Sequence, residues 1–123
     1  MDSQGQLVSF IRESVRSVWA LELLLLLRRT PDRLWTEEAL VRELRASLPL
    51  VRDNLAVFET SGLVACEAGG CRYAPASPVL AGLCDELERR YRESPVRLIN
   101  AIASPKDKLQ TLADAFKLKG DGK

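Results

Sequence analysis

The stretch that decides the fold is residues 61–75, SGLVACEAGGCRYAP. It holds two of the three cysteines of a chain that contains no histidine. Two short β-prone runs, residues 63–68 and 71–74, flank Gly69 and Gly70. A Gly-Gly pair suits a two-residue turn in which both central residues have positive φ. The stretch therefore predicts a β-hairpin with Gly69 and Gly70 at its tip.

The predicted turn also sets the register of the hairpin and the state of the cysteines. The register pairs Ala68 with Cys71, Glu67 with Arg72, and Cys66 with Tyr73. Because Cys66 and Cys71 are then not directly opposite, a disulfide between them is not favoured. A zinc site is not expected either, since Cys84 adds only a third ligand and no histidine exists. We therefore expect three reduced cysteines and no metal or other cofactor.

Length and composition indicate one small globular domain. The chain has 123 residues, of which 46% are hydrophobic, and its net charge is +1. The N-terminus, MDSQGQ, lacks the basic region of a signal peptide. The apolar run SVWALELLLLL contains Glu22 and is shorter than the roughly 18 to 20 residues that span a bilayer. These features predict a cytoplasmic protein with no membrane segment.

The N-terminal part of the chain, residues 4–29, is predicted to form one long helix. Apolar residues at helical spacing form a stripe at Leu7, Phe10, Ile11, Val15, Val18 and Trp19. From Leu21 to Leu27 the segment is apolar nearly all round, so it must be covered on more than one side. Two explanations remain open: it is the core of the domain, or part of its surface meets a partner subunit.

Capping residues mark the starts of five further helices. Thr36 precedes the predicted helix 37–45, and Ser47 precedes the predicted helix 48–60. A Ser-Pro pair opens each of the predicted helices 78–93, 95–103 and 105–119. The last residues, GDGK, are expected to form a frayed tail. We thus predict a mainly α fold with a small β-hairpin, divided into a core (4–75), a C-terminal helical extension (77–119) and a tail (120–123).

The order of these elements resembles the winged helix-turn-helix superfamily. TEEALVREL (36–44) is similar to its second helix, SLPLVRDNLAVFETSGLV (47–64) to its recognition helix, and ACEAGGCRYAP (65–75) to its wing. The ending LQTLADAFKLK (109–119) is similar to that of small bacterial winged-helix proteins. The resemblance implies a DNA-binding transcriptional regulator with the third helix in the major groove and the wing on the backbone.

Under that resemblance the candidate DNA-binding residues are few. Arg52 and Asn54 are candidates for reading base edges, whereas Arg45, Ser47 and Arg72 are placed to contact phosphates. Against DNA binding, residues 30–74 carry five arginines and seven acidic residues, a net charge of −2. The alternative is a winged helix that docks a signalling or transcription partner without binding DNA.

The sequence offers no motif for catalysis, and we expect no enzymatic activity. It does favour a homodimer, because the first helix and the C-terminal helices carry more apolar surface than a small core needs. The candidate interface residues are Leu7, Phe10, Ile11, Val96, Ile99, Leu109, Leu112 and Phe116. In the monomeric alternative, the C-terminal helices fold back over Phe10 and Trp19.

Overall fold

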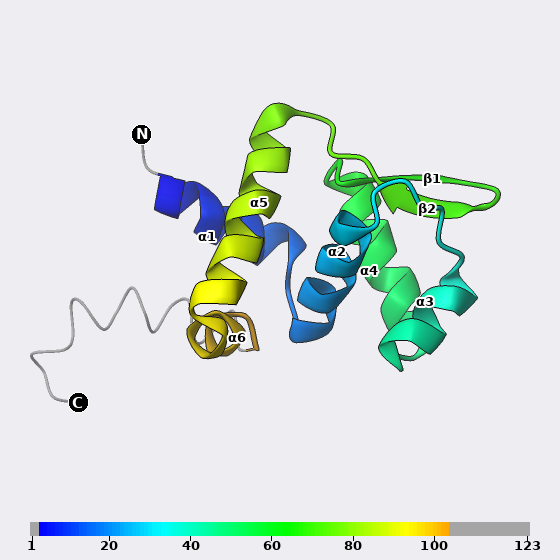
Figure 1. Ribbon diagram of the computed structural model, residues 1–123, viewed down its shortest axis with the longest axis horizontal. Coiled ribbons are helices and arrows are strands. Elements are labelled where there is room, and N and C mark those ends of the chain that lie inside the picture. The colour runs from blue at the N-terminus through cyan, green and yellow to red at the C-terminus, as the bar shows by residue number, and fades with distance from the viewer. Residues whose placement is uncertain (1–2, 104–123) are drawn as a thin grey trace, which may run out of the picture.

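The computed structural model describes residues 3–103. It contains six helices and one antiparallel hairpin within that range (Figure 1). The helices are α1 (Ser3–Ser14), α2 (Val18–Arg29), α3 (Glu37–Leu44), α4 (Leu48–Thr60), α5 (Pro78–Glu93) and α6 (Pro95–Ala103), and the strands are β1 (Val64–Glu67) and β2 (Gly70–Tyr73). The predicted fold class, mainly α with a small β-hairpin, is confirmed.

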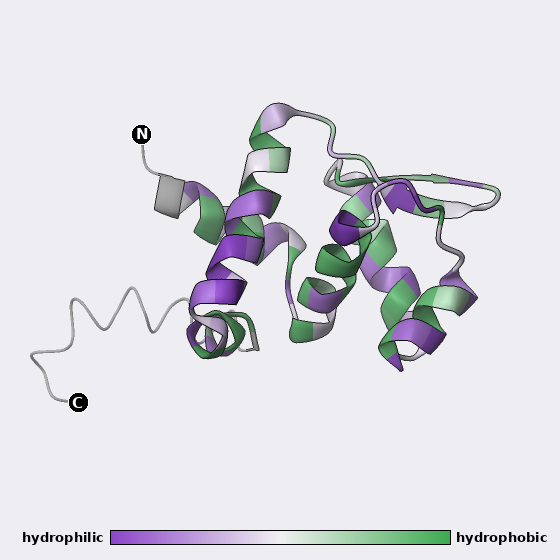
Figure 2. Cartoon of the chain, in the orientation of Figure 1, coloured by the Kyte–Doolittle hydropathy of each residue, from purple (hydrophilic) through white to green (hydrophobic). Residues whose placement is uncertain are grey.

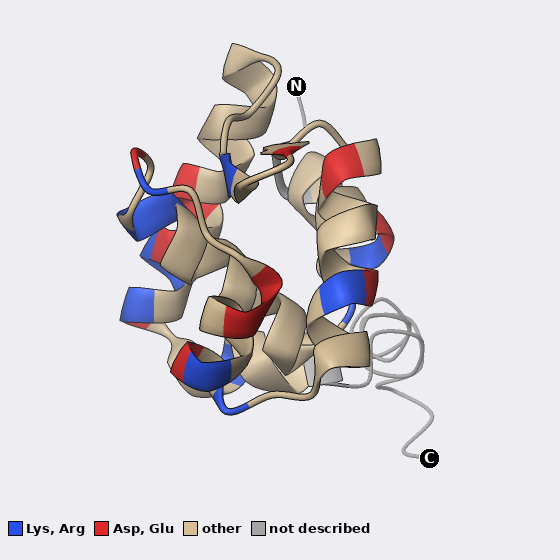
Figure 3. Ribbon diagram, turned by 90° about the vertical axis from the view of Figure 1, so that its right-hand side faces the viewer, with Lys and Arg blue, Asp and Glu red and all other residues tan. Residues whose placement is uncertain are grey.

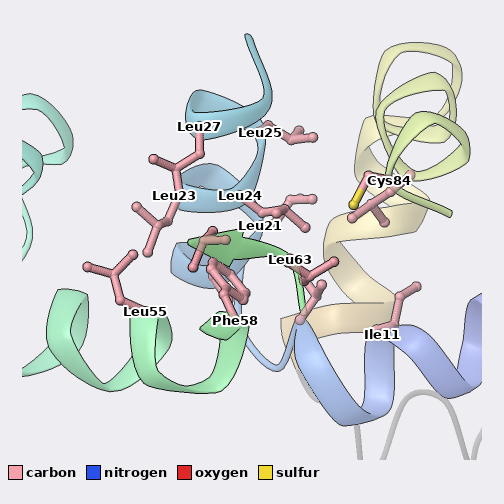
Figure 4. Packing of buried hydrophobic residues seen from close by; sticks show 14 of the residues in the cluster. Ile11, Leu21, Leu23, Leu24, Leu25, Leu27, Leu55, Phe58, Leu63 and Cys84 are labelled. Carbon is pink, nitrogen blue, oxygen red and sulfur yellow. The ribbon is translucent and has the colours of Figure 1, made fainter. Parts of the chain in front are cut away.

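Helix α2 is the centre of the molecule. It packs against α3, α4, α5, α6 and β2. Figure 4 shows Leu23 and Leu27 pointing to the side of Leu55 on α4, while Leu24 and Leu25 point toward Cys84 on α5. A helix covered on both sides needs apolar residues nearly all round. The leucine run is therefore explained by packing within one chain.

The single long helix predicted over residues 4–29 is wrong, because the chain breaks into α1 and α2. Ser17 is extended (φ −153°, ψ 165°), and its side chain accepts a hydrogen bond from the backbone N–H of Ala20. Ser14, at the end of α1, is buried and pairs with the Ser61 hydroxyl at 2.8 Å. The break lets α1 leave the axis of α2 and pack against α5.

Thr36, Ser47 and Ser77 cap the helices that follow them, as the sequence predicts. Thr36 accepts from the backbone N–H of Ala39, Ser47 from that of Leu50, and Ser77 from that of Leu80. Gly62, with φ 81°, follows the C-cap of α4, and the backbone N–H of Leu63 reaches the carbonyl of Phe58 at 2.8 Å. Local sequence thus sets the bounds of α3, α4 and α5 to within a residue.

The hairpin has a different register from the predicted one. The observed pairs are Val64 with Tyr73, Ala65 with Arg72, Cys66 with Cys71, and Glu67 with Gly70. The turn is therefore Ala68-Gly69, one residue earlier than expected. Gly70 has φ 133°, and a Cβ there would lie 2.2 Å from the carbonyl oxygen of Trp35. Gly70 is needed for the close approach of a neighbouring strand rather than for the turn.

That neighbouring strand is the link between α2 and α3. Trp35 forms an isolated antiparallel bridge with Cys71, in which each backbone N–H donates to the other's carbonyl at 2.8 Å. Trp35 is 3% exposed, and its indole N–H donates to the Thr30 hydroxyl at 3.0 Å. The link between α2 and α3 thus pairs with the outer edge of β2 at this one position.

The register also overturns the expected state of the cysteines. Cys66 and Cys71 lie directly opposite, with their Cα atoms 4.0 Å apart, and they are joined by a disulfide. The expectation of three reduced cysteines is therefore wrong for this pair. Cys84 is a free, buried thiol. The error followed from placing the turn one residue too late, which moved Cys66 opposite Tyr73.

Helices α5 and α6 begin and end where the sequence predicts, at 78–93 and 95–103. Figure 2 shows that the second half of α5 is strongly hydrophilic. One carboxylate of this segment, Glu88, is nevertheless buried (5% exposed), and it pairs with Arg28 at 2.5 Å and Arg29 at 2.7 Å on α2. The predicted helix 105–119 and the tail 120–123 lie outside the described residues.

Candidate functional site

An open depression in the described part of the chain lies between α4 and the hairpin. It has a volume of about 430 Å³. Its lining comes from four places: the Trp35 link, the start of α3, the middle of α4 and the whole hairpin turn. The lining residues are Trp35, Thr36, Glu37, Glu38, Arg52, Leu55, Ala56, Glu59, Cys66, Glu67, Ala68, Gly69, Gly70 and Cys71. We call this depression the α4–hairpin groove.

The α4–hairpin groove is acidic. Four of its lining residues are glutamates and one is an arginine. That arginine, Arg52, is already paired, because its guanidinium donates to both carboxylate oxygens of Glu37 at 2.9 and 3.3 Å. These hydrogen bonds lower the pKa of Glu37, so its carboxylate stays ionised at neutral pH. The groove therefore presents a negative potential to an approaching ligand.

The rest of the face around the hairpin carries both signs of charge. Figure 3 looks onto this side, where ribbon segments of acidic residues are interleaved with those of basic ones. Beside the hairpin, Arg33 stacks on the Trp35 ring, with its guanidinium 3.5 Å from the ring centre. The cations of this face are thus mostly engaged by neighbouring groups.

The predicted base-reading residues both have partners within the chain. Arg52 is exposed but bound to Glu37. Asn54 is half-buried, and its side-chain amide donates to the backbone carbonyl of Leu50 at 3.0 Å along its own helix. Each residue would have to give up an existing contact to reach a base.

The predicted phosphate contacts are separated in the structure. Arg45 is exposed and forms the C-cap of α3 with φ 55°. The Ser47 side chain already accepts a hydrogen bond as the N-cap of α4. Arg72 pairs with Glu67 at 3.3 Å, the charge pair that the sequence predicts. In the observed register Arg72 opposes Ala65 and reaches Glu67 diagonally. Among these three residues, Arg45 alone has no described carboxylate or capping partner for its side chain.

The candidate interface residues fall into three groups. Leu7, Phe10 and Ile11 are buried within the chain, where α1 meets α5. Val96 is 70% exposed and Ile99 is half-buried. Leu109, Leu112 and Phe116 lie outside the described residues. The surplus apolar surface of the first helix, which was the main reason to expect a dimer, is therefore covered within the chain, and self-association stays a prediction.

Two further titratable groups, Cys84 and Tyr73, lie together away from the groove. Burial raises the pKa of the Cys84 thiol and of the neighbouring Tyr73 phenol. Both groups are therefore neutral at physiological pH, and Cys84 is a poor nucleophile. The part of the chain that the structure describes contains no group of three or more side chains able to hold a metal ion. No described helix is both long and apolar enough to cross a membrane.

The groove could not be predicted from the sequence, because its lining residues belong to separate segments of the chain. Glu37 and Glu38 fit the first turn of a helix, where the helix dipole favours acidic residues. Glu59 counts only as an unfavourable charge for DNA binding, and Glu67 only as the cross-strand partner of Arg72. The available signal was the acidic excess over residues 30–74. What the sequence could not show is that the Trp35 link pairs with the hairpin and brings α3, α4 and the turn around one depression.

Comparison of the chain with known protein families, curated proteins and solved structures gives no match.

Proposed function

We propose that this chain is a winged-helix module that docks a protein partner through the α4–hairpin groove and binds a basic segment of that partner. One observation carries the proposal. The surface on which a winged helix would meet DNA is here a groove with four glutamates and a single arginine, and that arginine is already neutralised. A cationic peptide chain complements such a groove, whereas a polyanion does not.

The arrangement of the core supports a winged helix. Helix α2, the Trp35 link, α3, α4 and the hairpin follow one another in the order of that architecture. The two backbone hydrogen bonds between Trp35 and Cys71 add the link to the hairpin as a short third strand. The α3–α4 turn is short, with Arg45 in the left-handed conformation that allows the sharp change of direction.

Electrostatics weighs against DNA as the main partner. Neutralised phosphates release counterions, and this release supplies most of the non-specific affinity of DNA-binding proteins. Arg52 and Arg72 must each break an ion pair with a glutamate before they can contribute. The glutamates left behind would then lie close to the phosphate backbone.

A second candidate function, DNA binding, has one observation in its favour. Arg42 and Arg45 are exposed at the end of α3, beside the N-terminus of α4. Within the described residues neither forms an ion pair with a carboxylate. Two cations beside a helix N-terminus are placed to hold a phosphate and would orient α4 toward a duplex. Two contacts are nevertheless few for a DNA-binding protein.

The two functions are separated by measuring both ligands on the same protein. The probes are a fluorescently labelled peptide of alternating arginine and leucine, and a random-sequence DNA duplex of matched length. We expect the peptide to bind at low salt with one-to-one stoichiometry and to shift the backbone amide resonances of α4 and the hairpin. We expect no binding of the duplex at physiological salt.

The test variant is Glu59→Gln/Glu67→Gln, which removes two charges from the groove. Its matched control is Glu86→Gln/Glu93→Gln, which removes two charges from α5. We expect roughly tenfold weaker peptide binding in the groove variant and little change in the control, because only the former alters the potential at the site. Tight duplex binding that Arg52→Ala or Asn54→Ala abolishes would reject the docking proposal in favour of DNA binding.

A further inference from the structure

The cysteine pair sits at a position where a disulfide needs no rearrangement of the backbone. The backbone N–H and carbonyl of Cys71 both bond to Trp35, so they point away from Cys66. Cys66 and Cys71 are therefore a non-hydrogen-bonded pair of the antiparallel ladder, the kind in which opposite side chains come closest. Their Cα atoms are 4.0 Å apart. The register of the hairpin thus places the two cysteines directly opposite each other.

The hairpin does not depend on the disulfide for its register. Strand β1 is paired with β2 along four residue pairs, and Trp35 holds Cys71 from the other side. Gly70 permits that approach, since no other residue would fit against the Trp35 carbonyl. The bond closes a loop of only a few residues, and a short loop constrains the unfolded chain less than a long one. Opening the bond therefore leaves a folded hairpin with two facing thiols.

Both cysteines contribute to the lining of the α4–hairpin groove. Cys66 is half-buried, whereas Cys71 is 8% exposed and covered on one side by Trp35. A small molecule that enters the groove meets Cys66 first. Cys84, by contrast, is fully buried on α5.

We propose that Cys66 and Cys71 are a reversible thiol–disulfide exchange site, entered through the α4–hairpin groove and selective for cationic over anionic low-molecular-weight disulfides. The selectivity comes from the acidic lining of the groove. Its four glutamates outnumber the single Arg52, and Glu38 and Glu59 form no ion pair within the described residues, so the groove repels an anionic reagent and attracts a cationic one. This site shares the α4–hairpin groove with the docking function proposed above but does not require that function.

The exchange proceeds in two balanced steps. The Cys66 thiolate attacks one sulfur of the reagent disulfide, which forms a mixed disulfide and releases one reagent thiolate. The Cys71 thiolate then attacks the Cys66 sulfur and releases the second reagent thiolate. Two protein thiols are oxidised to one disulfide, one reagent disulfide is reduced to two thiols, and the two protons from the cysteines pass to the released thiolates. The reverse reaction with two reagent thiols reopens the bond.

The experiment uses the reduced full-length chain and three reagents that differ in charge: dicationic cystamine, neutral 2-hydroxyethyl disulfide and anionic glutathione disulfide. Samples are quenched with an alkylating reagent, and each cysteine is quantified by mass spectrometry. The same reactions on the chain unfolded in urea correct for the intrinsic reactivity of each reagent.

After this correction we expect cystamine to form the Cys66–Cys71 bond roughly tenfold faster than glutathione disulfide, with the neutral reagent between them. The difference shrinks in Glu59→Gln/Glu67→Gln and persists in the control Glu86→Gln/Glu93→Gln. Cys84 stays unmodified in the folded chain, and excess cysteamine reopens the bond.

Three results would overturn the proposal. The first is that the bond does not form with any reagent, and the second is that it forms but is not reduced by excess thiol. The third is that the three reagents react at equal corrected rates. The first two reject a reversible site, and the third rejects entry through the acidic groove. Peptide binding is not a readout here, so a failure of the docking function leaves this test intact.

Discussion

Three glycine-to-alanine substitutions test the register of the hairpin, since each glycine lies in a different environment. A Cβ on Gly70 would lie 2.2 Å from the backbone oxygen of Trp35, at a φ of 133° that alanine avoids. A Cβ on Gly69 would meet only the end of the flexible Leu34 side chain, at 2.8 Å. A Cβ on Gly82, on the exposed face of α5, would meet nothing within 4 Å.

The expected magnitudes follow from these contacts. Gly70→Ala forces a backbone conformation that costs about 1–3 kcal/mol, and it separates the strands, which loses two hydrogen bonds of about 1 kcal/mol each. We therefore expect a loss of about 3 kcal/mol in the free energy of unfolding. Gly69→Ala should cost less than about 1 kcal/mol. Gly82→Ala should stabilise the protein by about 0.5–1 kcal/mol, because alanine favours the helix.

The assay is urea unfolding followed by far-UV circular dichroism, combined with hydrogen exchange of the Trp35 and Cys71 amides. In Gly70→Ala these two amides should lose protection while the helices keep theirs. If Gly69 and Gly70 formed the tip of the turn, the two substitutions would have similar costs. Equal costs, or a Gly70→Ala variant as stable as the parent with both amides protected, would refute the described register.

Three further predictions concern the charges and the disulfide. Glu88→Ala should lower the free energy of unfolding by about 2 kcal/mol, because it leaves two partly buried arginines without their shared carboxylate. Asp85→Ala, at a side chain that is 63% exposed, should lower it by less than about 1 kcal/mol. Urea unfolding measures both changes. A Glu88→Ala variant no weaker than Asp85→Ala would show that the buried carboxylate does not tie α5 to α2. The guanidiniums of Arg89 and Arg90 lower the pKa of Glu86 in the folded state below its usual value of 4.5. The ionised Glu86 carboxylate therefore stabilises the fold fully above pH 4.5. This stabilisation is lost as the pH falls through the lowered pKa of the folded state. Thermal midpoints between pH 6 and 3 should accordingly fall more steeply for the parent than for Glu86→Gln, and parallel curves would contradict this. Reduction of the Cys66–Cys71 bond should lower the free energy of unfolding by no more than about 2 kcal/mol, and cooperative unfolding should persist in reductant; a chain that unfolds on reduction would show that the hairpin requires the bond.

Much of the candidate site could not be predicted from short stretches of the sequence. Arg52 was a reasonable candidate for base readout because it lies on the outer face of a helix. Its carboxylate partner, Glu37, is 15 residues away in the sequence, and the packing of α3 against α4 brings the two side chains together. The sequence suggested an acidic bias over residues 30–74, but the groove that concentrates this bias depends on the position of the hairpin.

The sequence by itself determined the elements whose signals are local. Thr36, Ser47 and Ser77 cap the helices that they precede, Gly62 ends α4, and each of these effects acts over three or four residues. Tertiary structure decided the break at Ser17 and the register at Gly70. At Ser17 helix propensity would let the chain continue, but the packing of α1 on α5 favours a turn. At Gly70 the local preference for a turn at Gly69-Gly70 is overridden by the bridge to Trp35. This bridge leaves no room for a Cβ on residue 70, so Gly70 lies in the strand and not in the turn.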